Sequence, residues 1–309
     1  MSKEIILQAC DSAQVGNYKW DLYYFRVDRK RNNPYMTFKV RFKNDTYMSD
    51  YANNLLNSIK FFQLGKVNDV QEYNGENTKI SCDKLALNSE LIKTNWDLFL
   101  SSIINPGEEK FKGKVQGYLL VGKSLAEDGK SITFVKTGNP LIKLSDNKAH
   151  FYRCTEDELD VVTDEYCRLY LTTDFIIYNN ILYTFNLNFE KIFNIEKTML
   201  RIKESRIEKI ALTQAIADED VFKRFAKEYK SAKTFVTLKQ ERIDKIQDNA
   251  KRHEVATMLN IELDDNNKFI IDTPEKASLF IRYICYKIFK DSETDDIIEV
   301  SNASKLEIN

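Results

Sequence analysis

The sequence predicts an α+β protein: a β-rich N-terminal domain with antiparallel hairpins, then a C-terminal domain that is mixed α/β and afterwards mainly helical. The 309 residues, 43% of them hydrophobic, are enough for two domains that each bury a core. Alternating apolar and polar residues concentrate early, whereas helical periodicity dominates later. Glycine stops at Gly138. We therefore expect domains over residues 1–145 and 146–309.

The first expected element is a hairpin. Its strands run from Trp20 to Val27 and from Met36 to Phe42, joined by a polar turn over residues 29–34. The second strand alternates apolar side chains with Thr37, Lys39, Arg41 and Lys43, and a period of two places each set on one face. After it we expect helices over 48–62 and 91–104, and strands near 115–121 and 131–137.

A second hairpin is expected over residues 168–178 and 181–187, because Asn179-Asn180 between them tolerates positive φ. Helical periodicity begins at Phe189 and is interrupted at residues 218–220, where aspartates can cap another helix. Further helix is predicted over 238–259. Thr273-Pro274 has the N-cap and first-turn residues of a last helix that reaches Ile288.

Composition excludes several classes of protein. Lys and Arg number 46 against 47 Asp and Glu, but residues 191–252 hold 16 against 10 and residues 253–309 hold 6 against 12. No run approaches the roughly 18 apolar residues of a membrane span, so we expect a cytoplasmic protein. Five scattered cysteines and two histidines offer neither a disulfide framework nor a metal site. We predict no cofactor.

Two basic segments are candidate phosphate contacts, because Lys and Arg neutralise the nucleic-acid backbone. The alternative for each is an ordinary solvated, salt-bridged surface. In the hairpin, cations lie near Tyr23, Tyr24 and Tyr35, and spacings of three and four place the helical cations along one flank. The candidates are Arg29, Lys30, Arg31, Lys39, Arg41 and Lys43 in the hairpin, and Lys223, Arg224, Lys227 and Lys230 in the helical segment.

Residues Gly117 to Ser124 match the phosphate-loop pattern G-x-x-x-x-G-K-S, which would make the protein a nucleotide-binding switch. A phosphate loop needs an open turn that leads into a helix. Here the intervening residues are Tyr-Leu-Leu-Val, which are typical of a strand interior. The sequence favours a strand that ends near Gly122.

A metal-dependent nuclease is a further alternative. It would use scattered acids such as Asp164, Asp174 and Glu190. No convincing catalytic cluster supports it, so the sequence favours a noncatalytic protein.

The C-terminal half resembles a known family in several pieces. They are the aromatic strand and N-F-E-x-x-F segment over Ile181 to Glu196, the helix Leu279 to Phe289, the strand Gly138 to Leu144, and the tail Glu299 to Leu306 with Ser304-Lys305. Together they resemble the KwaB-like family, the cytoplasmic component of the Kiwa anti-phage system. The resemblance implies a noncatalytic protein that binds DNA, forms homodimers and works beside the small membrane protein KwaA. It adds Lys305 to the DNA-binding candidates.

The combined hypothesis is a defence effector that binds phage DNA with little sequence preference and is recruited to the inner face of the membrane by a KwaA-like partner. It would block phage DNA replication or expression. Lys39, Arg41 and Lys43 on one strand face would be spaced about 6.6–7 Å apart, close to twice the phosphate repeat of one DNA strand, roughly 6.8 Å. We therefore expect the hairpin to contribute more than the helix.

Overall fold

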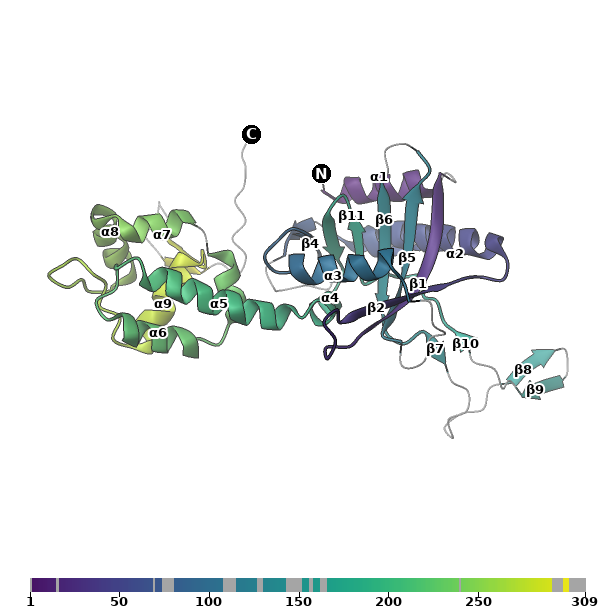
Figure 1. Ribbon diagram of the computed structural model, residues 1–309. Helices are drawn as coiled ribbons and strands as arrows, with labels where there is room; N and C mark the ends of the chain where they lie inside the picture. The colour runs from purple at the N-terminus through teal and green to yellow at the C-terminus, as the bar shows by residue number, and fades with distance from the viewer. Residues whose placement is uncertain are drawn as a thin grey trace. The chain divides into compact units, whose positions relative to one another are not determined.

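The computed structural model describes residues 2–14, 17–68, 70–73, 81–107, 115–126, 130–142, 152–155, 158–161, 166–238, 240–290 and 297–299. By its contacts the chain divides into two compact units. We call the described residues up to Phe193 the sheet unit and those from Asn194 onward the helical unit (Figure 1). The predicted boundary at 145/146 lies inside the sheet unit, because residues 175–184 form two strands of its sheet.

The sheet unit is built on an eight-stranded sheet within the described residues. Its order is β2-β1-β5-β6-β11-β12-β4-β3, and every pair is antiparallel except β3 with β4. The strands are β1 (Tyr18–Val27), β2 (Tyr35–Val40), β3 (Val70–Glu72), β4 (Cys82–Ala86), β5 (Gly117–Ser124), β6 (Ser131–Thr137), β11 (Phe175–Tyr178) and β12 (Ile181–Thr184).

Helices cover both faces of this sheet (Figure 1). On one face, α1 (Ser2–Gln14) and α2 (Asp45–Ser58) bury residues such as Ile6 and Leu56 against Leu120 and Ile176. On the other face lies α3 (Lys93–Ile104), whose Phe99 packs edge-on against Phe25 of β1 and Phe193. The short α4 (Asn188–Ile192) precedes Phe193. A π-turn (Ile59–Gln63) and a 3-10 turn (Leu64–Lys66) follow α2.

Both predicted hairpins are present. β1 pairs with β2, and β11 pairs with β12 across Asn179 and Asn180, which have φ of 50° and 59°. Positive φ at both central residues gives the turn whose twist matches the flanking strands. The second hairpin is shorter than predicted, since its first strand begins at Phe175. Small two-stranded pairs are β7 (Leu141–Ile142) with β10 (Tyr166–Cys167), and β8 (Tyr152–Thr155) with β9 (Glu158–Val161).

The helical unit buries a separate core that includes Ile210, Phe222, Phe235, Phe269 and Phe280. Its elements are α5 (Ile195–Ala211), α6 (Glu219–Glu228), a 3-10 turn (Ala232–Thr237), α7 (Gln240–Gln247), α8 (Asn249–Leu259), α9 (Pro274–Ile284), β13 (Ile288–Lys290) and β14 (Ile297–Glu299). Helices dominate this unit and strands dominate the sheet unit, which confirms the α+β prediction.

The caps of two helices are those expected. Asp218 accepts a hydrogen bond from the amide of Val221 at the start of α6, and Thr273 accepts one from Lys276 at the start of α9. The predicted helix over 238–259 is instead two helices, because Asp248 accepts from the amide of Ala250 and starts a new one. The last helix ends at Ile284 rather than Ile288, and strand β13 follows it.

Candidate nucleic-acid interface

The turn between β1 and β2 is held by one of its own cations. Arg29 donates hydrogen bonds to the carbonyls of Lys191 and Ile192, at 2.7 and 2.6 Å, where helix α4 ends. Its guanidinium also lies 5.8 Å from the ring centre of Tyr35. A cation beside terminal carbonyls offsets the negative end of the helix dipole. Arg29 therefore has structural partners and fixes the turn against α4.

Two more hairpin cations are paired with acids. Lys39 lies 2.6 Å from Asp21 on β1, and Arg31 lies 3.4 Å from Asp28 at the start of the turn. Both pairs are partly exposed, so each contributes little to stability. They neutralise the two acids of the hairpin, however. The charge that remains on it is therefore positive.

The regular spacing predicted for Lys39, Arg41 and Lys43 is wrong. β2 ends at Val40, so only Lys39 projects from the strand, and the other two cations follow it in irregular chain. The tyrosines also differ from the expectation. Tyr23 and Tyr35 are buried, and Tyr24 donates a hydrogen bond to the sulfur of Cys167 at 2.9 Å. These rings pack within the protein.

Of the candidate cations of the hairpin, three are exposed and form neither an ion pair nor a side-chain hydrogen bond with any described residue: Lys30, Arg41 and Lys43. We call them the hairpin set. They could meet phosphate without first breaking an internal contact. This is the feature of the hairpin most compatible with binding a polyanion.

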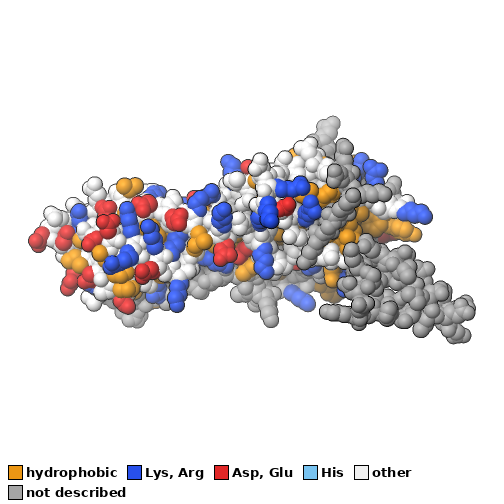
Figure 2. All heavy atoms as spheres, turned by 60° about the horizontal axis from the view of Figure 1, so that its bottom comes forward, with side chains coloured by type: hydrophobic (Ala, Val, Ile, Leu, Met, Phe, Trp, Pro, Cys, Tyr) orange, Lys and Arg blue, Asp and Glu red, His pale blue; other side chains and the backbone are white. Residues whose placement is uncertain are grey.

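In the helical unit the predicted flank is shorter than expected. α6 ends at Glu228, which places Lys230 beyond the helix, and Lys223 pairs with Glu208 at 2.8 Å. Of the four cations predicted to line this flank, three are exposed and form no ion pair with a described residue: Arg224, Lys227 and Lys230, which we call the helix set. In Figure 2, acidic and basic side chains are interspersed over the helical unit. Exposed acids also lie close to the helix set along the chain, at Asp218, Asp220 and Glu228.

The phosphate-loop pattern is a strand. Residues Gly117 to Ser124 form β5, and Gly117 and Gly122 lie directly opposite Phe25 and Trp20 of β1. A Cβ atom at either glycine would collide with the facing aromatic ring. The two glycines therefore make room for rings on the neighbouring strand. The motif has a packing role, and its backbone forms ladder bonds with β1 and β6 in place of a phosphate cradle.

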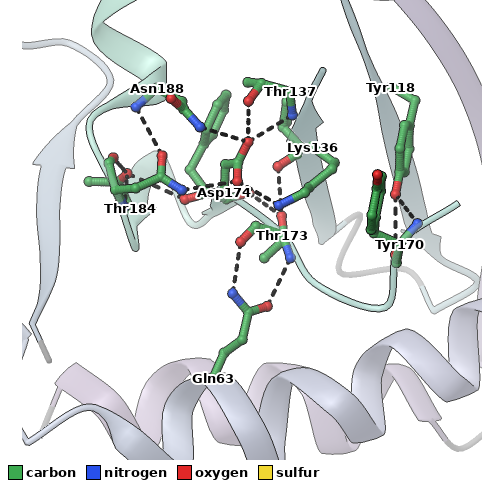
Figure 3. A network of polar contacts seen from close by, with 12 residues as sticks. Gln63, Tyr118, Lys136, Thr137, Tyr170, Thr173, Asp174, Thr184 and Asn188 are labelled. Atoms are coloured by element: carbon green, nitrogen blue, oxygen red, sulfur yellow. Dashed lines mark hydrogen bonds and ion pairs between the residues drawn. The ribbon is translucent and has the colours of Figure 1, made fainter. Parts of the chain in front are cut away.

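Asp174, one of the acids proposed for a nuclease, is a buried carboxylate held by hydrogen bonds within the sheet unit. The side chain of Asp174 is 3% exposed, and both of its oxygens accept hydrogen bonds, from Lys136, Asn186, Asn188 and both the amide and the hydroxyl of Thr137 (Figure 3). Burial raises the pKa of Asp174, but the bonds from Lys136 and Thr137 outweigh it and hold that pKa below its usual value.

The other two acids give no more support. Glu190 accepts a hydrogen bond of 2.5 Å from Tyr73, and Asp164 lies outside the described residues, as does Lys305. Among described side chains, no group of three or more His, Cys, Asp or Glu is placed to hold a metal ion. None of the described helices is long and apolar enough to cross a bilayer.

Comparison with known proteins gives one family. The KwaB-like model, described as Kiwa protein KwaB-like, matches residues 113–291. Searches of curated proteins and of solved structures gave no significant match. The matched segment begins just before β5 and ends just after β13. It therefore contains the helix set but not the hairpin set. The chain belongs to the KwaB-like family of the Kiwa anti-phage defence system.

Proposed function

We propose that this Kiwa component is a noncatalytic DNA-binding protein that contacts phosphates through the hairpin set, with a smaller contribution from the helix set. The proposal depends on one observation: Lys30, Arg41 and Lys43 are exposed and have no acidic partner among the described residues. The two acids of the hairpin, Asp21 and Asp28, are already paired with other cations. Contacts to phosphate alone carry no sequence information, so binding has little sequence preference.

The helix set is weaker because of its neighbours. Asp218 and Asp220 are exposed at the start of α6, and Glu228 is exposed at its end. Each of these carboxylates lies on or next to the same helix as the helix set and repels phosphate. The hairpin lacks such uncompensated acids among its described residues, and this difference supports the ranking.

The test is a salt titration of affinity for a labelled duplex. Wild type should lose affinity steadily as salt rises, since bound cations release counterions from DNA. Changing Lys30, Arg41 and Lys43 to Glu should weaken binding more than changing Arg224, Lys227 and Lys230 to Glu. A third variant with Lys66, Lys93 and Lys197 changed to Glu has the same net charge at scattered exposed sites and should bind nearly as wild type.

Each outcome has a clear meaning. Affinity that does not depend on salt, or absence of binding at low salt, would refute the proposal. A hairpin variant that binds as wild type, beside a helix variant that does not, would reverse the ranking. Melting temperatures should be almost unchanged in all three variants, because solvated surface substitutions rarely alter stability by more than about 0.5 kcal/mol.

We also infer assembly from family membership. The protein would form homodimers and act beside a KwaA-like small membrane protein that recruits it to the inner face of the membrane. Near-zero net charge with a basic and an acidic segment favours such self-association. Light scattering at micromolar concentration should give twice the chain mass of 36.2 kDa, and KwaA should co-purify with the tagged protein. A strict monomer would contradict the first inference.

A further inference from the structure

An arginine in the helical unit lies among three aromatic rings. The guanidinium carbon of Arg242, on α7, is 4.3 Å from the ring centre of Tyr283, 4.3 Å from that of Tyr286 and 5.5 Å from that of Phe289. Tyr283 is buried, whereas Arg242, Tyr286 and Phe289 are only half-buried. We call these four residues the arginine–aromatic cluster. It presents a planar cation and two partly open rings at the surface of this unit.

The backbone at Tyr286 is unusual for such a residue. Its φ is 58°, and it follows the end of α9, where the amide of Tyr286 bonds to Tyr283 and that of Lys287 bonds to Arg282. This helix ending strongly favours glycine, because a side chain is strained at positive φ. The other described non-glycine residues with positive φ are five asparagines and a glutamine. Position 286 therefore carries an aromatic ring although its backbone conformation favours glycine.

Charge around the cluster is mixed. Burial raises the pKa of Cys285 to about 12, and the positive charges of Lys287 and Arg206 act against that rise, which places both cations near this helix end. Glu241 accepts a hydrogen bond from the hydroxyl of Tyr286. Electrostatic attraction alone would thus give this surface only modest affinity for DNA. A ligand would have to be recognised through the rings.

We propose that the arginine–aromatic cluster binds unpaired bases of single-stranded DNA, which stack on Tyr286 and Phe289 beside the guanidinium of Arg242. Aromatic rings and guanidinium planes both stack on bases, and each stacked base is worth roughly a tenfold change in affinity. Bases within a duplex already stack on each other and are not available. The inference rests on the proposed DNA-binding function and assigns it a second, single-strand site.

The test compares single-stranded with double-stranded DNA. Affinity is measured for a labelled single strand of thymidines and for a random-sequence duplex of the same length. Tyr286→Gly removes the ring while accommodating the positive φ, and should weaken single-strand binding about tenfold with duplex binding unchanged. Tyr286→Phe is the matched control, because it keeps the ring and loses only the hydroxyl, which bonds to Glu241. It should bind the single strand as wild type.

A cross-linking experiment on the wild-type protein tests the same site without a substitution. A single strand containing 5-iodouracil, irradiated in the complex, should cross-link to Tyr286 or Phe289, which mass spectrometry would locate. Cross-links only at other residues, or equal single-strand affinity of Tyr286→Gly and wild type, would overturn the inference. If Tyr286→Gly does not fold, the cross-link position decides.

The two proposals fail in different ways. If wild type binds neither form of DNA, the proposed function fails and the cluster proposal fails with it. If wild type binds duplex with the expected salt dependence but the Tyr286 variants do not differ on single strands, only the cluster proposal is refuted.

Discussion

The two units satisfy their buried charges in opposite ways. In the sheet unit, a buried carboxylate, Asp174, is surrounded by donors from β6 and from the chain after β12 (Figure 3). Among the described residues of the helical unit, the buried charged side chains are cations, and backbone carbonyls accept their hydrogen bonds. Lys203 of α5 donates to the carbonyls of Lys227 and Tyr229 at 2.7 and 2.6 Å, where α6 ends.

A second cation in the helical unit does the same. The guanidinium of Arg252 donates to the carbonyls of Ile246, Gln247 and Asn267 at 2.6, 3.3 and 3.2 Å, and the first two lie at the end of α7. The last carbonyls of a helix have no partner within it. Because residues from Asn194 onward include no glycine, left-handed helix endings there fall to Asn260 and Tyr286, and internal cations cap other terminal carbonyls.

This difference shows why counting charges overstates a binding surface. Residues 191–252 contain 16 Lys and Arg, but Lys203 and Arg252 are buried caps and Lys223 is paired with Glu208. Arg29 has the same capping role in the sheet unit. A cation that holds a helix end is unavailable to DNA unless that end is released. The hairpin set and the helix set are the candidate cations that take part in none of these structural contacts.

The largest expected effect is at Asp174. Asp174→Ala should lower the free energy of unfolding of the sheet unit by about 3–5 kcal/mol, because it leaves the half-buried Lys136 without its acid and removes the acceptor of four other donors. Urea unfolding followed by tryptophan emission measures this, since Trp20 and Trp96 both lie in the sheet unit. A loss below about 1 kcal/mol would contradict the assignment of Asp174 as a structural carboxylate.

The sign of the pH dependence follows from the lowered pKa of Asp174. A carboxylate with a pKa below its unfolded value of 3.8 stabilises the fold at higher pH, and this contribution disappears as pH falls through the folded pKa. The stability difference between wild type and Asp174→Asn should thus be full at pH 7 and shrink below about pH 4. A constant difference down to pH 2 would contradict it.

The next effect is at Lys203. Lys203→Met keeps the apolar stem but leaves two carbonyls at the end of α6 without their donor, which should cost about 1–3 kcal/mol. The control is Lys197→Met on the exposed side of the same helix, α5, which should change stability by no more than about 0.5 kcal/mol. Thermal unfolding followed by circular dichroism compares them. Equal melting temperatures for the two variants would remove the cation-capping explanation.

A smaller effect is expected at Asn260, which ends α8 with a φ of 52°. Asn260→Ala should cost about 1–2 kcal/mol, because a Cβ is strained at positive φ and alanine lacks the local hydrogen bonding that helps asparagine. Asn260→Gly should be neutral or slightly stabilising. The same thermal scan measures both. If Ala and Gly are equivalent here, the left-handed ending is not what stabilises this helix end.

Local patterns predicted much of the fold. The Asn179-Asn180 turn, the caps at Asp218 and Thr273 and the strand nature of β5 are all properties of a few neighbouring residues. Helix α1 had a signal that sequence reasoning missed: Ile6, Ala9, Cys10 and Ala13 follow the spacing of one helical face, and all are buried.

Long-range contacts were beyond these patterns. β11 and β12 insert between β6 and β4, so strands distant in sequence become neighbours. Which cations bind carbonyls depends on where helices end in space, and no spacing within the sequence shows that Lys203 meets α6. The alternation of apolar and polar residues likewise continues to Lys43, so it could not reveal that β2 ends at Val40. The sequence predicted that Lys and Arg would form the candidate site. The structure was needed to show which of these cations have no internal partner and are available to bind phosphate.

The smallest effect is expected at Lys123, in the phosphate-loop pattern. This lysine is exposed near the end of β5, directly opposite Lys19 of β1, so Lys123→Ala removes a like-charge pair and should change stability by no more than about 0.5 kcal/mol. Addition of ATP or GTP should not shift the melting temperature of wild type or variant. Gly117→Ala is the contrast, since its Cβ would meet the carbonyl of Lys136 and the ring of Phe25, and it should cost about 1–3 kcal/mol. A nucleotide-dependent shift that Lys123→Ala abolishes would restore the phosphate-loop interpretation, because a strand lysine has no reason to produce one.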